Sequence, residues 1–365
     1  MKLSNNQQAF LELVKAGLWE REAYLIPYGD IDFQEIYRLA QEQTVVGLVA
    51  AGVEHVIDTK TPQDVTLLFV GDTLQYEQRN KAMNCFIGKL FDKLLPVCEH
   101  LLLVKGQGIA QCYERPLWRM SGDIDLLISS CDYNKTRDAL LNIVDRADKE
   151  VPEIRHQGVI IGLWEVELHG SLRGLWSPRV DRAIDKYQKE CFEGEHYRIW
   201  DNEEVEIALP SVDYDLVFVF THILQHFFRG GLGLRQICDM ARLIWTYNRD
   251  IDVQKLDMRL REMGLQSEWN VFAALCVDLL GMPVESMPLY SSLKKWKRKA
   301  ERLLLIVLGR KNIGFTHDNN GNGFLTRKLV SLGHHTSDFI HHYSVFPLDA
   351  IMYFCRLVGR GLHLS

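Results

Sequence analysis

The stretch Gly122-Asp123-Ile124-Asp125-Leu126-Leu127-Ile128-Ser129 places two aspartates at the head of a short apolar run. The run stops too soon for a helix and is typical of a buried strand. In a strand, Asp123 and Asp125 point to the same side, roughly 6.6 Å apart along the chain. Two such carboxylates repel each other, and a cation between them relieves the repulsion. The stretch therefore suggests a metal site, with a polar turn before a core strand as the alternative.

The same four residues, Gly-Asp-Ile-Asp, also occur at 29–32. There they are followed by FQEIYRLAQEQ, which has helical periodicity. Asp32 and Glu35 have the spacing of a helix cap, in which the aspartate accepts from first-turn N–H groups and the glutamate reaches back. We therefore expect the first copy to be a cap and only the second copy to carry chemistry.

The neighbours of the second copy support a phosphate-handling site. Upstream, LLLVKGQG (101–108) reads as a strand that runs into glycines and then into a helix over 109–113. Glycines let backbone N–H groups approach a phosphate, and Lys105 can add a positive charge. Downstream, the alternation in EVELHG places Glu167 and His169 on one face of a strand. Glu167 is thus the natural third carboxylate, on a neighbouring strand.

The chain divides into three zones. Residues 1–95 read as an N-terminal helical region that ends in a long helix from about Pro62 to Leu95. Residues 96–209 read as a mixed unit in the order β-α-β-α-β-β-β, with a helix over 133–148 capped by Asp132 and a final hairpin. Residues 210–365 read as a C-terminal helical domain.

Bulk composition excludes several protein classes. The net charge of −6 gives no general attraction to nucleic acid or anionic lipid. None of the eight cysteines lies in a CxxC pair, so neither a zinc ribbon nor a redox pair is indicated. Their scatter through apolar stretches is typical of buried reduced thiols. The N-terminus is too polar for a signal peptide, and the apolar runs are too short to span a membrane. We expect a cytoplasmic protein with no membrane partner.

The combination of an apolar strand, KG, a short helix, Arg, GDIDLL and a later ELH resembles the nucleotidyltransferases of the DNA polymerase β superfamily. The branch it resembles most is the uncharacterised nucleotidyltransferase family, and the stretch 221–244 is also similar to that branch. The likeness spans about 30 to 245. It implies an α+β fold, with a polymerase β-like core of mixed sheet and flanking helices between the N-terminal and C-terminal helical regions.

The resemblance also implies roles for individual residues. The implied metal-binding and catalytic residues are Asp123, Asp125 and Glu167. The implied nucleotide-binding residues are Lys105, Gly106, Gln107, Gly108 and Arg119. His169 is a candidate for orienting Glu167 or touching the acceptor. The chain departs from the superfamily at two points: Gln107 follows Gly106 where serine or glycine is frequent, and the spacer from Gly106 to Asp123 is long.

Two functional hypotheses follow from the resemblance. In the first, the protein uses Mg²⁺ or Mn²⁺ to transfer a nucleoside monophosphate from an NTP to an unidentified acceptor hydroxyl, releasing pyrophosphate by a two-metal mechanism. The acceptor is a protein, an RNA end or a small molecule. In the second, the protein is a catalytically silent module that binds nucleotide or a partner on the same fold.

Other motifs favour structural roles. His222 and His226 are one helical turn apart and could bind zinc, but without a third ligand we favour a packing or polar contact. Arg235 and Asp239 have the spacing of a helix ion pair. Alternatively, both pairs face the active-site cleft. The basic stretch 293–311 reads as a solvated helix face, and the four histidines in GHHTSDFIHHY, at 334, 335, 341 and 342, are weak as a metal site.

Overall fold

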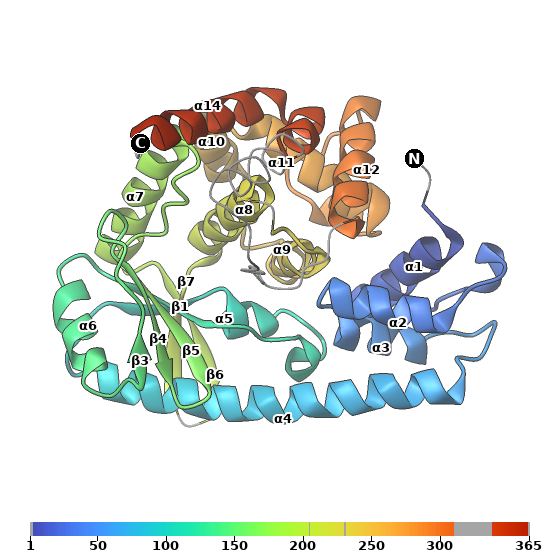
Figure 1. The fold of residues 1–365 in the computed structure, drawn as a ribbon, viewed down its shortest axis with the longest axis horizontal. Helices are drawn as coiled ribbons and strands as arrows, with labels where there is room; N and C mark the ends of the chain where they lie inside the picture. Colours follow the sequence, from blue (N-terminus) through green and yellow to red (C-terminus); the bar gives the residue numbers. More distant parts are fainter. Residues whose placement is uncertain (1–2, 204, 230, 310–337, 364–365) are drawn as a thin grey trace, which may run out of the picture.

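The structure of the protein is a computed structural model that describes residues 3–203, 205–229, 231–309 and 338–363. It has a mixed α+β architecture. In the described residues, four α-helices precede the first strand: α1 (Asn5–Trp19), α2 (Phe33–Glu42), α3 (Val46–Glu54) and α4 (Gln63–Leu94). The 32-residue α4 confirms the long helix predicted from the sequence, and it runs beneath both the other N-terminal helices and the sheet (Figure 1).

A five-stranded mixed sheet follows α4, with the strand order β1-β2-β5-β4-β3. Its strands are β1 (Leu101–Val104), β2 (Ile124–Ile128), β3 (Arg146–Ala147), β4 (His156–Ile161) and β5 (Trp164–His169). β2 pairs with β5 in parallel, and the other neighbours are antiparallel. Every residue of β2 is buried, which explains why its sequence is apolar apart from Asp125.

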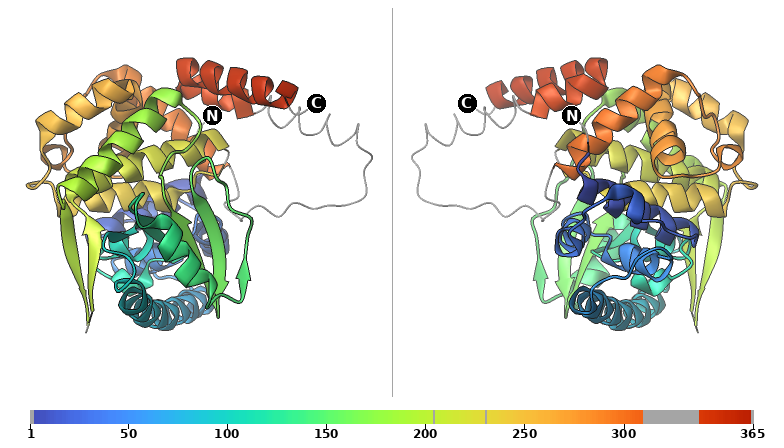
Figure 2. Two further views of the ribbon diagram at one scale, coloured as in Figure 1. Left: turned by 90° about the vertical axis from the view of Figure 1, so that its left-hand side faces the viewer. Right: turned by 90° about the vertical axis from the view of Figure 1, so that its right-hand side faces the viewer.

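Three further helices and a hairpin connect and flank the sheet. They are α5 (Gly106–Ala110), α6 (Tyr133–Leu141), α7 (Pro178–Glu193) and the antiparallel hairpin β6 (Tyr197–Asn202) and β7 (Val205–Pro210), which was predicted. An apolar cluster joins α4, the sheet and this hairpin, and it includes Met83, Ile87, Phe91, Leu103, Leu126 and Ile207. The cluster fixes the sheet on α4, which Figure 2 views along its axis at the bottom of the molecule.

The C-terminal helices form a layer across the molecule from α4 (Figure 1). They are α8 (Val212–Arg229), α9 (Leu234–Thr246), α10 (Val253–Met263), α11 (Gln266–Ala274), α12 (Lys294–Leu308) and α14 (Pro347–His363). One apolar cluster joins them to the N-terminal helices, and it includes Phe10, Leu13, Val46, Phe220, Ile237 and Leu304. The first and last parts of the chain therefore share a core. No helix in the described ranges has both the length and the hydropathy of a membrane-spanning segment.

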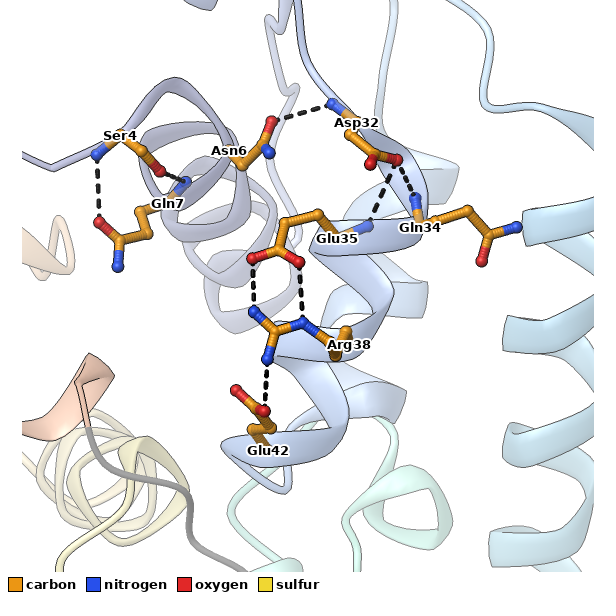
Figure 3. Close-up of polar contacts among 8 residues, drawn as sticks. All are labelled: Ser4, Asn6, Gln7, Asp32, Gln34, Glu35, Arg38 and Glu42. Atoms are coloured by element: carbon orange, nitrogen blue, oxygen red, sulfur yellow. Dashed lines mark hydrogen bonds and ion pairs between the residues drawn. The ribbon is translucent and has the colours of Figure 1, made fainter.

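The first Gly-Asp-Ile-Asp copy ends in a helix cap, as predicted. The carboxylate of Asp32 accepts from the backbone N–H groups of Gln34 at 2.9 Å and Glu35 at 3.4 Å (Figure 3). The predicted return contact from Glu35 is wrong, because this side chain pairs with Arg38. The N–H of Asp32 instead donates to Asn6 Oδ1 on α1 at 2.9 Å. The cap therefore also ties α2 to α1.

The structure corrects the predicted middle zone at several points. The elements β3, β4 and α7 were not predicted. The helix predicted over 133–148 ends at Leu141 as α6, and part of the remainder forms β3. Asp132 does not cap α6; its carboxylate accepts from the backbone N–H of His100 at 3.2 Å and from Ser129 Oγ at 3.0 Å. This aspartate therefore ties α6 to the ends of β1 and β2.

The predictions for the C-terminal region are partly outside the described residues. Within the basic stretch 293–311, Lys294–Leu308 forms α12, and residues 310 and 311 lie outside the described residues. Leu303, Leu304 and Leu308 are buried while most of the basic side chains are exposed, so the solvated helix face is confirmed. His334 and His335 lie outside the described residues.

Candidate active site

Strand register brings three carboxylates together. Asp125 on β2 is the direct register partner of Glu167 on β5, and Asp123 lies immediately before β2. Carboxylate oxygens of the three residues all lie within 4.8 Å of one another. We call these residues the acid cluster. An all-oxygen donor set of this kind fits Mg²⁺ or Mn²⁺.

The charges within the acid cluster are unequal. Asp125 is only 3% exposed, and it accepts from Lys105 Nζ at 2.5 Å and from His169 Nε2 at 2.7 Å. Burial opposes its ionisation, but the charge of Lys105 and the hydrogen bond from His169 lower its pKa. Repulsion from Asp125, together with burial, raises the pKa of Asp123 to about 6. Asp125 is therefore the fixed negative charge, and Asp123 is the member that gains most from an added cation.

Glu167 is held by two histidines. His156 Nε2 and His169 Nε2 each lie 3.3 Å from Glu167 Oε2. Burial opposes ionisation of Glu167, but these two hydrogen bonds lower its pKa. The carboxylate is therefore ionised and positioned before any ligand binds.

The turn between β1 and α5 has an unusual backbone. Lys105 has φ of 59° and Gly106 has φ of 40°, a region that a lysine rarely adopts. Such strain persists only where the surrounding structure enforces it, and it is concentrated at functional sites. The short helix begins at Gly106 rather than at the predicted Ile109, and with five residues it adds little dipole. The turn's main effect is to aim the lysine at Asp125.

The next residues of the turn support α5 from behind. Gln107 is buried and donates to Asn80 Oδ1 at 2.9 Å, and Asn80 donates in turn to the backbone carbonyl of Arg119 at 2.8 Å. Gly108 packs so closely on Leu209 that a Cβ would come within 2.9 Å of its side chain. The glutamine that departs from the superfamily pattern thus links α5 to α4 and to the loop before β2.

Arg119 lines the cleft but is held by an acid. Its guanidinium makes two hydrogen bonds to Asp239 on α9, both at 2.7 Å. Tyr113 also donates to Asp239, at 2.8 Å. The predicted pairing of Asp239 with Arg235 is therefore replaced, and Arg235 donates to the carbonyl of Met120 at 2.9 Å. Arg119 acts as a brace between the loop before β2 and α9.

The acid cluster opens into a cleft of about 580 Å³. A volume of this order is typical of small-molecule sites and accommodates a nucleotide. The floor is the acid cluster with the strained turn, and the facing wall is built by α8 and α9. The wall residues from these helices include His222, His226, Arg229, Arg235 and Asp239. The alternative in which both helical pairs face the cleft is confirmed.

The two wall histidines contact each other. Their Nε2 atoms are 2.9 Å apart, so one imidazole donates to the other. Burial lowers the pKa of His226 to about 4 and that of His222 well below its usual value. Within the described ranges, no third ligand completes a metal group with them. The expected polar contact on one helix is confirmed, and at neutral pH both rings are uncharged.

Two wall arginines form no ion pair with a carboxylate among the residues that the structure describes. Arg229 donates to the carbonyl of Gly174 at 3.0 Å, and Arg235 donates to that of Met120. Neither guanidinium has a carboxylate at ion-pairing distance among the described residues. The buried Nε of Arg235 has no hydrogen-bond partner. The wall therefore offers donors for an anion opposite the acid cluster.

His156 and Arg229 are cleft residues that the sequence reasoning missed. His156 lies on β4, which runs into β5 through a two-residue turn, Gly162-Leu163. The sequence does contain a hairpin pattern here. The runs 156–161 and 164–169 hold β-branched and aromatic residues, and the pair between them contains a glycine, which is typical of a tight hairpin. Arg229 follows the last buried turn of α8 and has no local signal of this kind.

A family model described as "Uncharacterised nucleotidyltransferase" matches residues 29–281. The match includes the acid cluster, the strained turn and the α8–α9 wall. No curated protein and no solved structure matches the chain.

Proposed function

The chain belongs to the family of uncharacterised nucleotidyltransferases, and from this premise we propose that it transfers a nucleoside monophosphate from an NTP to an acceptor hydroxyl, releasing pyrophosphate. The observation that carries the proposal is the acid cluster, which lines the same cleft as Arg229 and Arg235. We further propose that the five-stranded mixed sheet is a polymerase β-like core with helical regions on either side.

Asp123, Asp125 and Glu167 would hold the Mg²⁺ or Mn²⁺ ions. Bound there, such ions neutralise triphosphate charge and lower the pKa of an attacking hydroxyl. The raised pKa of Asp123 supports this assignment, because a cation beside it relieves the repulsion from Asp125. A carboxylate with a lowered pKa is a weak base, so we assign Glu167 to ion binding rather than to proton removal.

The phosphates of the NTP would bind between the two sides of the cleft. The backbone at Gly106 and the ammonium of Lys105 lie on the floor, and Arg235 and Arg229 lie on the wall. A guanidinium can give two parallel hydrogen bonds to a phosphate, so the unpartnered Nε of Arg235 suits this role. We assign Arg119 a positioning role, because Asp239 already accepts two of its hydrogen bonds.

A catalytically silent nucleotide-binding protein is the second candidate. The observation that favours it is the ion pair between Lys105 and Asp125, since the lysine neutralises the residue on which a catalytic ion would depend. Both candidates bind NTP, and only the first releases pyrophosphate.

Turnover separates the two candidates. The full chain is incubated with Mg²⁺ or Mn²⁺, each of the four α-labelled NTPs and mixtures of protein, RNA and small-molecule acceptors, and both label transfer and pyrophosphate are measured. We expect Asp123→Asn to lower the rate about 100-fold or more, as for the loss of several kcal/mol of charge stabilisation.

The first Gly-Asp-Ile-Asp copy provides a matched control. Asp30 holds the same position in that copy and is exposed, so Asp30→Asn should keep the wild-type rate. NTP binding without pyrophosphate release in any mixture would favour the silent protein. Equal rates for the two variants would exclude the acid cluster as the site.

A further inference from the structure

A second group of possible metal ligands overlaps the acid cluster. His156, Glu167 and His169 each place one donor atom within 4.8 Å of the other two. We propose that these three residues bind a divalent transition-metal ion of the Zn²⁺ class, at a site that differs in ligand chemistry from the all-oxygen acid cluster. We call it the histidine site.

The sheet holds the three ligands in place. His156 on β4 is the direct register partner of His169 on β5, and Glu167 lies two residues before His169 on the same face. Both Nε2 atoms lie 3.3 Å from the same carboxylate oxygen, Glu167 Oε2, and the two rings are 4.9 Å apart between centroids. Three donors that converge from paired strands need little rearrangement to bind one ion.

The donor types select the metal. Imidazole nitrogen suits Zn²⁺, Co²⁺ and Fe²⁺, whereas Mg²⁺ prefers oxygen ligands alone. Two histidines and one glutamate are a known set of protein ligands for zinc at sites that keep a position open for water or substrate. All three residues line the cleft, so an ion can reach them and an acceptor can reach the ion.

The single N–H that His169 Nε2 can offer is too few for the two carboxylates that lie beside it. His169 Nε2 lies 2.7 Å from Asp125 Oδ1 as well as 3.3 Å from Glu167 Oε2. A ring nitrogen carries one proton at most, so the two carboxylates must share it. An ion bound to His169, His156 and Glu167 would replace this shared contact with three direct bonds.

Binding to the histidine site does not depend on the proposed transfer reaction. Glu167 belongs to both ligand sets, but the histidine site is tested with metal alone and without nucleotide. The transfer reaction can therefore fail while the histidine site is real, and the reverse also holds.

Cobalt is a suitable probe because tetrahedral Co²⁺ absorbs visible light. Metal-free full-length protein is titrated with Co²⁺ in excess Mg²⁺ at neutral pH, and Zn²⁺ is then added to displace the cobalt. We expect one equivalent of Mg²⁺-resistant Co²⁺ in the wild type. We expect His156→Gln to bind it about tenfold more weakly or worse, and His169→Gln likewise.

His55 provides the matched control. Its Nε2 lies 2.6 Å from Glu20 Oε2, so it is a histidine–glutamate pair outside the cleft, and His55→Gln should bind Co²⁺ as the wild type does. Thermal melting of each variant checks that it is folded. The proposal is overturned if the wild type binds no Mg²⁺-resistant Co²⁺. It is also overturned if folded His156→Gln binds Co²⁺ with wild-type affinity, or if His222→Gln loses Co²⁺ binding while the His156 and His169 variants keep it.

Discussion

Lys105 is the residue whose replacement tests the electrostatics of the site most directly. Its ammonium lies 2.5 Å from Asp125 Oδ1, and both side chains are largely buried. Although burial alone would lower it, the charges of Asp125 and Asp123 raise the pKa of Lys105. Lys105→Met keeps the aliphatic stem and removes the charge, so the acid cluster loses its nearest cation.

The expected loss of stability follows from the burial of this pair. Removing one partner of a buried ion pair costs about 3–5 kcal/mol. His169 still donates to Asp125 in the variant, which places the expected loss near the lower limit, about 3 kcal/mol. With an unfolding entropy near 2.1 cal/mol/K per residue, about 1 kcal/mol shifts the Tm of a chain of 365 residues by about 1.3 °C. The variant should therefore melt about 4 °C below the wild type.

Mg²⁺ should reverse this loss. In the wild type an ion bound at the proposed site would compete with Lys105 for Asp125, whereas in the variant it would meet a carboxylate that has lost its ammonium partner. A ligand that binds only the folded state raises stability according to its affinity. Melting curves in EDTA and in millimolar Mg²⁺ should therefore show a larger rise in Tm for Lys105→Met than for the wild type.

Lys81 supplies the control. It pairs with Glu77 one turn away on α4, at 2.6 Å, and its side chain is 61% exposed. Lys81→Met should cost less than about 0.5 kcal/mol and leave the Mg²⁺ response unchanged. The prediction is refuted if Lys105→Met and the wild type have the same Tm in EDTA. It is also refuted if Mg²⁺ raises the Tm of Lys105→Met and of the wild type by the same amount.

Three further predictions concern stability away from the acid cluster. Burial and the neighbouring Asp349 raise the pKa of Glu268 to about 8, so its contribution to stability is complete below about pH 4.5 and is lost as pH rises through 8. Between pH 6 and 9 the free energy of unfolding of the wild type should fall by about 3 kcal/mol because of this group, and that of Glu268→Gln should not show this fall. Both are measured by urea unfolding, and an equal change with pH in the two proteins would refute the assignment. Asp32→Ala should cost about 1 kcal/mol with no change in transfer rate, and unaltered unfolding would contradict the cap. Asp239→Asn should lower the free energy of unfolding by about 3 kcal/mol or more, because it leaves Arg119 buried without its acid. The double variant Asp239→Leu with Arg119→Met should recover most of this loss, as measured by thermal melting.

The site and cap residues that the sequence could identify were found from residue spacing within a single helix or strand. Asp125 on β2 lies two residues after Asp123, which stands just before that strand, and Glu167 and His169 lie two residues apart on β5. Each pair could therefore be assigned to one side from its spacing alone. The two hydrogen bonds that Asp32 accepts as a cap come from the three residues that follow it, whereas the side chain of Glu35 pairs with Arg38 instead of making the predicted return contact. These features are decided within one element, which is why the structure agrees with them.

The remaining features depend on contacts between distant segments. Asp239 pairs with Arg119 across 120 positions of sequence, so its spacing from Arg235 predicted the wrong partner. Gln107 was read as a departure from a phosphate-binding turn, and only the position of Asn80 on α4 gives it a buried partner. β4 was missed because Gln and Gly interrupt its apolar pattern, and His156 was missed with it.

The contacts that hold two of the cleft-lining segments differ in strength. The pair of Arg119 and Asp239, between the loop before β2 and α9, is buried, and Arg242 on α9 donates to the carbonyls of Leu18 on α1 and Cys112 after α5, both at 2.7 Å. By contrast, an exposed hydrogen bond joins Arg173, after β5, to the carbonyl of Glu153, in the loop before β4. Breaking the first set costs several kcal/mol, and breaking the exposed bond costs far less. The loop before β4 can therefore open locally at a much lower cost in free energy than the junction between α9 and the loop before β2.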